Sequence, residues 1–334
     1  MTFNIRQNSI VYVLCPANIQ TGGTELLHQL VCALNKKNIK SYIVYFGDKS
    51  KFEISTKFSK YIYKYITIDE INDSQNNYLI TPEVSIYLLK RFSFINKVIW
   101  WLSVDNALYN LSFKYRMQQK GIINAIGNFF LNRYVSFEYL QSITYHLCQS
   151  NYAIDFLKKK GIESSYIEYL SDYISEDYLI ESIDTKRDDI VLYNPKKGYE
   201  YTKNIISKLS SIECIPLTNF DINQLRQLYL KSKVYIDFGN HPGKDRIPRE
   251  AAALGCIVIT NRKGSANFDE DVPIPEYYKI NDLGNETLII NKIIYCIKNY
   301  KEKTKDFEKY RKIIGDEKEN FYNALDKLFK VENV

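Results

Sequence analysis

The sequence predicts an α/β protein made of two parallel-sheet domains. Short runs rich in β-branched and aromatic residues alternate with amphipathic helical patterns along the whole chain, which is the order found in parallel sheets. The 334 residues exceed one ordinary core and suit two domains of about 150 residues each. The alternation also restarts after an acidic segment, residues 171–189, which marks the expected domain boundary.

Runs with the composition of buried strands recur through the first half. They occupy these residues: 9–17, 41–47, 78–83, 97–106 and the start of 146–162. Between the first two runs, residues 21–40 supply a glycine-containing turn and an amphipathic helix, which completes a βαβ unit. Residues 109–145 are aromatic and irregular, and the pattern assigns no element there.

The second half repeats the alternation of strands and helices. Its expected strands are the start of 189–198, then 213–217, 233–239 and 255–261. Its later expected helices are 221–232, 286–299 and 302–330. Because ligands of open parallel sheets lie outside the carboxyl ends of the strands, the loops that follow these strands are the expected binding positions.

Composition narrows the class of protein. The net charge of +6 suits phosphorylated substrates or an anionic membrane face, but it lacks the basic stripe that nucleic-acid-binding proteins show. The six cysteines are widely spaced without a C-x-x-C pair, so we expect free thiols in a reducing cytoplasm. The N-terminal residues do not resemble a signal peptide, and the apolar runs fall short of the ~20 residues that span a membrane. We therefore expect a cytoplasmic protein, soluble or peripheral at a membrane.

The stretch TGGTELLHQL, residues 21–30, joins a strand to a helix through two glycines. Gly22 and Gly23 would let the backbone approach a ligand, and the free N–H groups of the helix start suit a phosphate. The alternative is a tight turn in which Thr21 or Thr24 caps the helix. The stretch is not the G-x-G-x-x-G fingerprint and lacks the Walker lysine, which argues against classical dinucleotide binding and P-loop hydrolysis.

The motif NPKKG, residues 194–198, follows the first strand of the second half. From this position Lys196 and Lys197 would reach a phosphate, since the motif lies at the carboxyl end of a strand. The alternative is that this lysine pair is solvated surface.

The strongest motif is HPGKDRIPREAAALGCIVITN, residues 241–261, which predicts a loop, a helix and a strand. Three basic residues crowd the helix entrance: Lys244, Arg246 and Arg249. They oppose the helix dipole, so we interpret them as groups that neutralise a diphosphate, to which arginine binds in bidentate fashion. Glu250 lies in the first turn, where the dipole favours a carboxylate; the functional alternative is that it accepts two hydroxyl hydrogen bonds from a ribose.

Three further candidates border the same helix entrance. His241 and Gly243 precede the helix, and Ser265 follows the next strand. We expect them to border a bound nucleotide, because loops that follow parallel strands meet at one edge of the sheet.

The stretch WWLSVDN, residues 100–106, ends a strand with an acid beside two tryptophans. Sugar rings stack on aromatic side chains and carboxylates accept their hydroxyl groups, so Trp101 and Asp105 are candidates for acceptor binding. The alternative is that the tryptophans belong to the core and Asp105 caps the next turn.

The acids DED, residues 269–271, are spaced like a metal-binding D-x-D motif. They lie in a polar loop with two prolines, whereas a strand presents the acids of that motif. We interpret them as a solvated loop and expect no metal site.

Together these motifs resemble the GT-B glycosyltransferases of family 4. The resemblance rests on GGTELLHQL, on NPKKG, on PREAAALGCIVIT and on CQSNYAIDFLKKKGI, and HPG-x-x-x-x-P-x-EAA is closest to the rhamnan-synthesis type of surface-polysaccharide transferase. It implies two Rossmann-like domains that face each other across a cleft. The implied parts are an acceptor domain at 1–172, a nucleotide-sugar donor domain at 173–310 and a C-terminal helix at 311–334 that crosses back to the first domain.

The resemblance also implies roles for single residues. Gly22 and Gly23 would approach the donor phosphates, Lys197 matches the pyrophosphate-binding lysine, and Glu250 matches the glutamate that binds the donor ribose. The family's first glutamate falls on Pro242, which leaves the contact to the sugar ring unexplained. The family's upstream arginine has no match, and its substitutes would be Lys196, Lys244 or Arg246.

The implied function is transfer of a hexosyl or deoxyhexosyl group from a nucleotide-diphosphate sugar, with retained configuration and without metal or cofactor. Asp105 is the catalytic candidate. The acceptor would be a glycan or lipid-linked glycan of a capsule or lipopolysaccharide, with peripheral contact of 109–135 at the inner membrane face. Two alternatives are a GT-B sugar-nucleotide epimerase and a catalytically silent subunit that binds nucleotide sugar or glycan.

Overall fold

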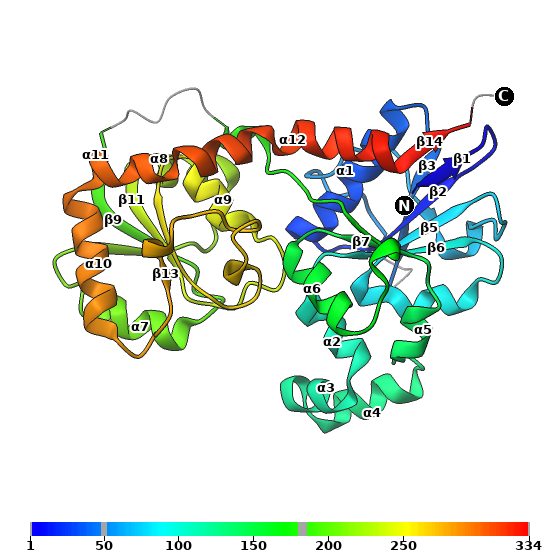
Figure 1. Ribbon diagram of the computed structural model, residues 1–334, viewed down its shortest axis with the longest axis horizontal. Coiled ribbons are helices and arrows are strands. Elements are labelled where there is room, and N and C mark those ends of the chain that lie inside the picture. The colour runs from blue at the N-terminus through cyan, green and yellow to red at the C-terminus, as the bar shows by residue number, and fades with distance from the viewer. Residues whose placement is uncertain (1, 48–51, 180–185, 333–334) are drawn as a thin grey trace. The chain divides into compact units, whose positions relative to one another are not determined.

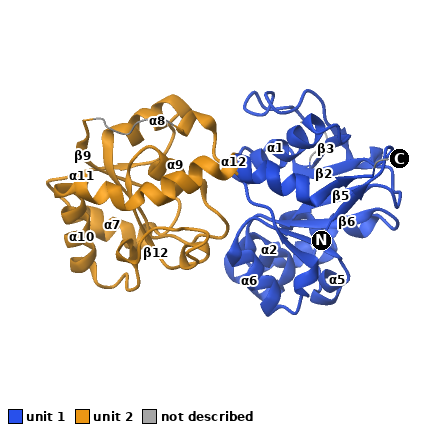
Figure 2. Ribbon diagram, turned by 45° about the horizontal axis from the view of Figure 1, so that its top comes forward, with its two compact units in different colours: residues 1–172, 319–334 blue, residues 173–318 orange. Residues whose placement is uncertain are grey.

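The computed structural model describes residues 2–47, 52–179 and 186–332. The chain forms two compact units, which are residues 1–172 with 319–334 and residues 173–318 (Figure 2). Part of the expected boundary segment, residues 180–185, lies outside the described residues. The C-terminal helix α12 (Glu308–Leu328) begins in unit 2 and ends in unit 1.

Unit 1 contains a seven-stranded sheet in the order β4-β3-β2-β5-β6-β7-β8, and each pair of neighbours is parallel. Its strands are β2 (Val11–Pro16), β3 (Ser41–Phe46), β4 (Ile66–Thr67), β5 (Tyr78–Pro82), β6 (Asn96–Trp101), β7 (Tyr145–Cys148) and β8 (Ile167–Tyr169). The central strands are nearly continuous apolar runs because helices cover both faces of such a sheet. The order reverses between β2 and β5.

The connections of unit 1 are α1 (Gly22–Lys36), the 3-10 segment η3 (Glu83–Arg91), α2 (Val104–Leu111), α3 (Phe113–Lys120), α4 (Ile122–Phe130), α5 (Phe137–Gln141) and α6 (Asn151–Lys159). The region at 109–145, which the sequence left unassigned, thus contains short helices (Figure 1). Gly121, with φ of 83°, separates α3 from α4, and α3 has no buried residue, so no apolar period marks it in the sequence.

A separate pair of strands joins the two ends of unit 1. β1 (Phe3–Ile5) pairs in parallel with β14 (Phe329–Val331). The expected helix at 302–330 therefore ends earlier, at Leu328, and it is preceded by α11 (Tyr300–Lys303) and a 3-10 turn, η8 (Thr304–Phe307). Three-residue strands carry too little periodicity to be predicted from sequence.

Unit 2 contains a five-stranded parallel sheet in the order β10-β9-β11-β12-β13. Its strands are β9 (Asp188–Tyr193), β10 (Glu213–Pro216), β11 (Ser232–Asp237), β12 (Ile257–Asn261) and β13 (Lys279–Ile280). Its helices before α11 are α7 (Tyr199–Ser207), α8 (Ile222–Lys231), α9 (Arg246–Ala253) and α10 (Glu286–Lys298). The order reverses between β9 and β11, as it does between β2 and β5 in unit 1.

Among the described residues, no helix combines the length and the apolar character needed to cross a bilayer.

Candidate functional site

The reversal of strand order in unit 2 brings three predicted motifs to one edge of its sheet. Residues 194–198 follow β9, residues 238–245 follow β11, and residues 262–265 follow β12. Loops that diverge at such a reversal leave a crevice at the carboxyl ends of the strands, where open α/β sheets bind their ligands. The expected positions of the donor-binding motifs therefore coincide with the binding edge of unit 2.

Glycines let these three loops pack against one another. Gly198 has φ of 60°, and a Cβ there would lie 2.5 Å from the carbonyl carbon of Phe238. A Cβ on Gly239 would overlap the Cβ of Lys197, and one on Gly264 would overlap the carbonyl oxygen of His241. Any larger residue would push the loops apart, so these glycines fix the shape of the crevice.

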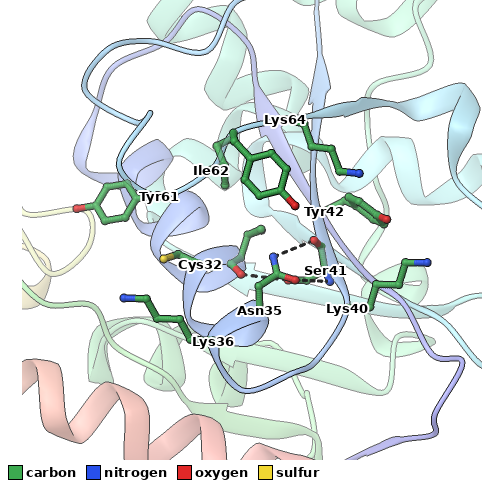
Figure 3. Close-up of a pocket in the computed structure, with 11 residues that line it drawn as sticks. Cys32, Asn35, Lys36, Lys40, Ser41, Tyr42, Tyr61, Ile62 and Lys64 are labelled. Carbon is green, nitrogen blue, oxygen red and sulfur yellow. Dashed lines mark hydrogen bonds between the residues drawn. The ribbon is translucent and has the colours of Figure 1, made fainter.

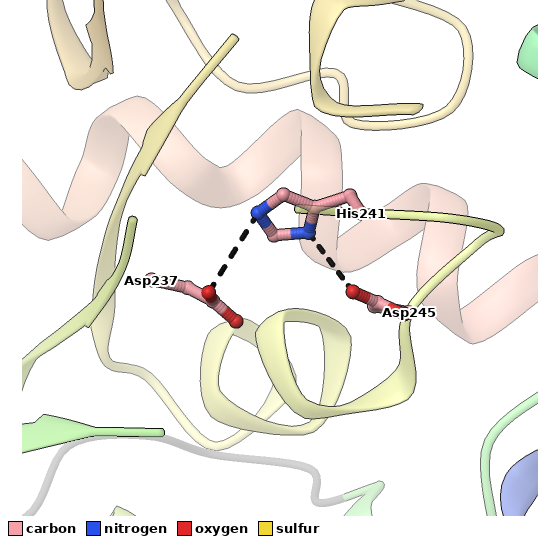
Figure 4. A group of neighbouring side chains, drawn as sticks. All are labelled: Asp237, His241 and Asp245. Atoms are coloured by element: carbon pink, nitrogen blue, oxygen red, sulfur yellow. Dashed lines mark ion pairs between the residues drawn. The ribbon is translucent and has the colours of Figure 1, made fainter. Parts of the chain in front are cut away.

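A chain of charges connects the first two loops, and Figure 4 shows three of its members, Asp237, His241 and Asp245. His241 Nδ1 lies 3.0 Å from Asp245 Oδ2, and the same oxygen lies 2.5 Å from the Nζ of Lys197. On its other side, His241 Nε2 lies 3.8 Å from Asp237 Oδ1. Asp237 is held in turn by the hydroxyl of Tyr235, which donates a hydrogen bond of 2.8 Å.

This geometry favours a protonated His241. Burial by itself lowers the pKa of His241, but the carboxylates of Asp237 and Asp245 outweigh burial and raise it. For Asp245, burial alone would raise the pKa, but the hydrogen bond from His241 and the charge of Lys197 hold the pKa below its usual value. The four groups thus form two matched ion pairs.

The same three side chains also have the spacing of a metal site. One ligand atom from each of Asp237, His241 and Asp245 lies within 4.8 Å of the others. A metal would require a neutral imidazole and would compete with the ammonium of Lys197 for Asp245. We therefore interpret the group as an ion-pair network. The expectation of no metal at residues 269–271 stays a prediction.

Two of the three basic residues at the helix entrance pair with the same acid. Arg249 is fully buried, and its Nη1 lies 2.8 Å from Glu317 Oε2; Lys244 Nζ lies 3.1 Å from Glu317 Oε1. Glu317 belongs to α12 and is itself buried. The carboxylate of Glu317 thus neutralises two side chains, Lys244 and Arg249, that the sequence analysis expected to neutralise a diphosphate. No local sequence pattern predicts this partner, because Glu317 lies 68 residues from Arg249 in the chain.

The remaining candidates of unit 2 differ in their surroundings. Lys196 is exposed, and Arg246 begins α9. Ser265 is buried, and its hydroxyl donates a 2.6 Å hydrogen bond to the carbonyl oxygen of Gly243. Glu250 is half-buried in α9 and lies near Tyr229, where burial first and then the Glu250 carboxylate raise the pKa of the phenol. Its role in ribose binding stays a prediction.

In unit 1, the two glycines lie at the start of α1. Thr21 caps this helix, and its hydroxyl and that of Thr24 each accept a hydrogen bond from the other's backbone N–H, at 3.3 Å and 2.9 Å. This is the capped turn that the sequence offered as the alternative. A Cβ on Gly23 would meet Leu102 at an ordinary 3.5 Å, so packing inside unit 1 does not require glycine there. Close approach of a ligand to Gly23 remains a prediction.

The structure favours the core alternative for Trp101. Its side chain has no exposed surface, and the indole Nε1 donates to His146 Nδ1 at 3.1 Å. No ring face is left open for a sugar, which argues against the predicted acceptor contact. Asp105 is half-buried in the first turn of α2 and accepts a 3.3 Å hydrogen bond from Tyr152.

Glu83 is an acid at a strand end that sequence reasoning overlooked. It follows β5 and is 2% exposed, and its carboxylate accepts a 3.0 Å hydrogen bond from the backbone N–H of Leu102. Burial raises the pKa of Glu83 to about 7. The only sequence signal was a single acid at the end of an apolar run, which is also the pattern of an exposed loop.

A hollow of about 410 Å³ lies elsewhere in unit 1 (Figure 3). It is lined by the end of α1 and the start of β3, with Lys40 and Lys64 lying 5.9 Å and 5.1 Å from the ring of Tyr42. Ser41 begins β3, so this hollow is at the amino ends of the strands. It is therefore outside the binding edge of the sheet.

Two parallel α/β units that share a final helix have the GT-B fold, as the sequence predicted. A glycosyltransferase from Rickettsia africae ESF-5 matches with a TM-score of 0.65 and 15% identity over 96% of this chain and 98% of that chain. Anabaena HepE in complex with UDP-glucose matches with a TM-score of 0.61 and 11% identity over 96% of this chain and 100% of that chain. WaaG, a glycosyltransferase involved in lipopolysaccharide biosynthesis, matches with a TM-score of 0.57 and 9% identity over 94% of this chain and 98% of that chain.

No protein-family model matches the sequence, and no curated protein matches it. At identities this low, the structural matches establish the fold alone. The assignments to family 4 and to the rhamnan-synthesis type stay predictions.

Proposed function

We propose that this protein is a glycosyltransferase that moves a sugar from a nucleoside diphosphate to an acceptor hydroxyl. The observation that carries the proposal is the convergence of the loops after β9, β11 and β12 where the strand order of unit 2 reverses. The fold supports it, since the similar structures are glycosyltransferases and HepE was solved with UDP and with UDP-glucose.

Unit 2 would bind the donor diphosphate. Lys196 is exposed, and Lys197 is held by Asp245 with its side chain 30% exposed, so both are accessible to an anion. Arg246 would add a third positive charge from the start of α9. Glu250 would accept the ribose hydroxyl groups. Because these cations offset the phosphate charge, the reaction would need neither a metal nor a cofactor.

The transfer would proceed with retained configuration. The bond between the anomeric carbon and the diphosphate oxygen breaks as the acceptor oxygen bonds to the same carbon from the same face. The departing diphosphate gains negative charge, which Lys196 and Lys197 would stabilise. The acceptor proton passes to the departing diphosphate or to Asp105, which lies at the start of α2 after β6 and is our catalytic candidate.

The acceptor would be a lipid-linked or free glycan of a surface polysaccharide, and unit 1 would contact the membrane. Ile123 and Phe130, both in α4, are 86% and 80% exposed. Residues 106–137 contain four basic residues and no acid. Exposed apolar side chains among positive charges are typical of helices that lie at an anionic membrane surface.

A panel of nucleotide sugars tests the proposal. The measurement is free nucleoside diphosphate, released with and without glycan acceptors. We expect release that an acceptor stimulates. Inversion or hydrolysis of the donor without an acceptor would indicate an epimerase instead, and binding without turnover across the panel would indicate a silent subunit.

A further inference from the structure

A polar hollow of about 360 Å³ lies at the other side of unit 1 from the one in Figure 3. It is bounded by η3, which follows β5, and by α2, α3 and α4, which follow β6. These three helices are labelled in Figure 1. The hollow is therefore built by segments that leave the carboxyl ends of two neighbouring strands. That is the edge at which open parallel sheets bind ligands.

Three cations line this hollow, and no carboxylate does. They are Arg116 and Lys120 from α3 and Arg133 from the segment after α4. Within residues 2–47, 52–179 and 186–332, none of the three forms an ion pair. Burial, and to a smaller extent the like charge of Arg133, lower the pKa of Arg116. Like charges gathered without a counter-charge are costly unless an anion joins them.

Arg116 is held in place before any ligand binds. Arg116 donates to the carbonyl oxygen of Tyr109 at 2.7 Å, and to the amide oxygens of Asn110 and Asn124 at 3.1 Å each. Asn110 is 4% exposed and donates in turn to the carbonyl oxygen of Val84 at 2.8 Å. These bonds use three of the five guanidinium N–H groups. The others remain for a ligand.

Aromatic rings support the two outer cations. Lys120 Nζ lies 5.4 Å from the ring centroid of Tyr109, and the Arg133 guanidinium lies 5.4 Å from that of Tyr87. A buried second amide, Asn128, lines the base of the hollow beside Asn110. One hydrogen-bonded guanidinium, two further cations beside aromatic rings and the amide groups can together bind a phosphoryl group through charge-assisted hydrogen bonds.

We propose that this hollow binds a phosphoryl group of the acceptor, as a phosphate monoester or diester. The inference that the ligand is the acceptor rests on the proposed transferase function. The anion site itself is independent of the donor site in unit 2. Two sources share this chemistry. One is the phosphate of a lipid carrier, which would leave its chain at the apolar face of α4, and the other is a soluble phosphorylated glycan.

The soluble arm of the test uses glucose 1-phosphate as the probe and glucose as its uncharged control, with the full chain in calorimetry. We expect binding of glucose 1-phosphate and a loss of at least about tenfold in affinity in the double variant Lys120→Gln/Arg133→Gln. Arg91→Gln is the matched control, since Arg91 is an exposed arginine of unit 1 that pairs with Asp69 outside the hollow. Unchanged affinity in a folded double variant overturns the proposal.

The vesicle arm distinguishes the two sources. Vesicles of phosphatidylcholine with phosphatidic acid are compared with phosphatidylcholine alone. Retention on the phosphatidic acid vesicles that the double variant loses assigns a lipid phosphate. Binding of glucose 1-phosphate without retention on vesicles assigns a soluble ligand.

UDP affinity, measured on the same samples, separates this inference from the proposed function. We expect Lys197→Gln to weaken UDP binding only, and the double variant to weaken glucose 1-phosphate binding only. If no variant or wild-type protein binds UDP while the phosphate site behaves as described, the donor proposal fails and the hollow stands. If UDP binds as expected but the double variant binds glucose 1-phosphate as wild type does, the hollow fails and the donor proposal stands.

Discussion

The Nδ1 atom of His241 lies 3.0 Å from the Oδ2 atom of Asp245, and the same oxygen accepts a hydrogen bond from the ammonium of Lys197. One carboxylate thereby joins the loop after β11 to the loop after β9. Because a second acid, Asp237, lies on the other side of His241, the charges of His241 and Lys197 together balance two carboxylates, and His241 and Asp237 have almost no exposed surface. The position of Lys197 therefore depends on the protonation of His241.

Substitution of His241 tests this dependence through pH. The raised pKa means that protonated His241 stabilises the folded state fully below about pH 6.5, and that this stability is lost as the pH rises through the raised value. We expect the free energy of unfolding of the wild type to fall as the pH rises above about 6.5, and His241→Gln to lack that part of the fall. Urea unfolding across this range measures it.

His28→Gln serves as the control for His241. Burial lowers the pKa of His28 to about 4, so this histidine of unit 1 is neutral throughout the range. Its substitution should change stability by a constant amount at pH values well above about 6.5, because only below that pH does the unfolded imidazole take up a proton, and the pH dependence there has the opposite sign to that of His241. A His241→Gln slope that equals the wild-type slope would show that His241 is not charged in the folded protein.

Glu317 provides a second prediction, because one carboxylate neutralises both Lys244 and Arg249 in a buried environment. Glu317→Gln would remove the carboxylate that both buried cations contact. We expect a loss of about 3 kcal/mol in the free energy of unfolding. Chemical unfolding measures it against Glu319→Gln, an exposed glutamate of the same helix. Equal stability of the two variants would contradict the assigned network.

The fold was predictable because the strands are long apolar runs. Residues 9–17 contain β2, and residues 189–198 and 233–239 cover β9 and β11 except for the first residue of each, since a strand buried on both faces needs continuous apolar residues. The helices at 109–145 escaped prediction because α3 buries none of its side chains and so shows no apolar period.

The candidate site was predictable only in its loops. Lys197, His241 and Ser265 were proposed because each follows a strand, and the structure places all three in loops at the carboxyl edge of the unit 2 sheet. Their part in donor binding stays a prediction. The partner of Arg249 was not found, because Glu317 comes from a distant helix and an ion pair across 68 residues leaves no sequence period. The sequence left two alternatives open for Trp101, because a tryptophan beside a strand-end acid fits an open ring or a core position equally well, and the burial of its side chain favours the core.

Donor binding gives a third prediction. Lys197→Gln removes a positive charge from the loop after β9, and Glu250→Gln weakens acceptance of two ribose hydroxyl groups. We expect each variant to bind UDP about tenfold more weakly than wild type. Calorimetry measures the affinities, with Lys298→Gln and Glu213→Gln as controls, since these residues are exposed in unit 2 away from the three loops.

The two substitutions have separate outcomes. Glu250 also lies near the phenol of Tyr229, so a folding check by unfolding free energy accompanies the affinity measurement. Unchanged affinity in a folded Glu250→Gln removes Glu250 from the site. Unchanged UDP affinity in Lys197→Gln would exclude the loop after β9 from the donor site.

Glu83 yields a fourth prediction, in unit 1. Burial raises its pKa from 4.5 to about 7, so the neutral acid contributes stability fully below pH 4.5, and that stability is lost as the pH rises through about 7. We expect Glu83→Gln to exceed wild type by about 3 kcal/mol at about pH 8 and to match it at about pH 4. Urea unfolding at both pH values measures the difference. Glu163→Gln, an exposed control in the same unit, should differ from wild type by the same free energy of unfolding at both pH values.

Membrane contact by α4 gives the last prediction. Phe130 and Ile123 project into solvent, and Phe130→Ser combined with Ile123→Ser would remove apolar area that lipid would otherwise cover. We expect the double variant to lose about tenfold or more in its partition onto vesicles that contain phosphatidylglycerol, measured by sedimentation. Tyr63→Ser is the matched control, because Tyr63 is 89% exposed but lies outside residues 106–137. Since none of these side chains lies in unit 2, UDP affinity should be unchanged in all variants, and equal partition of the double variant and the control would exclude α4 as the contact.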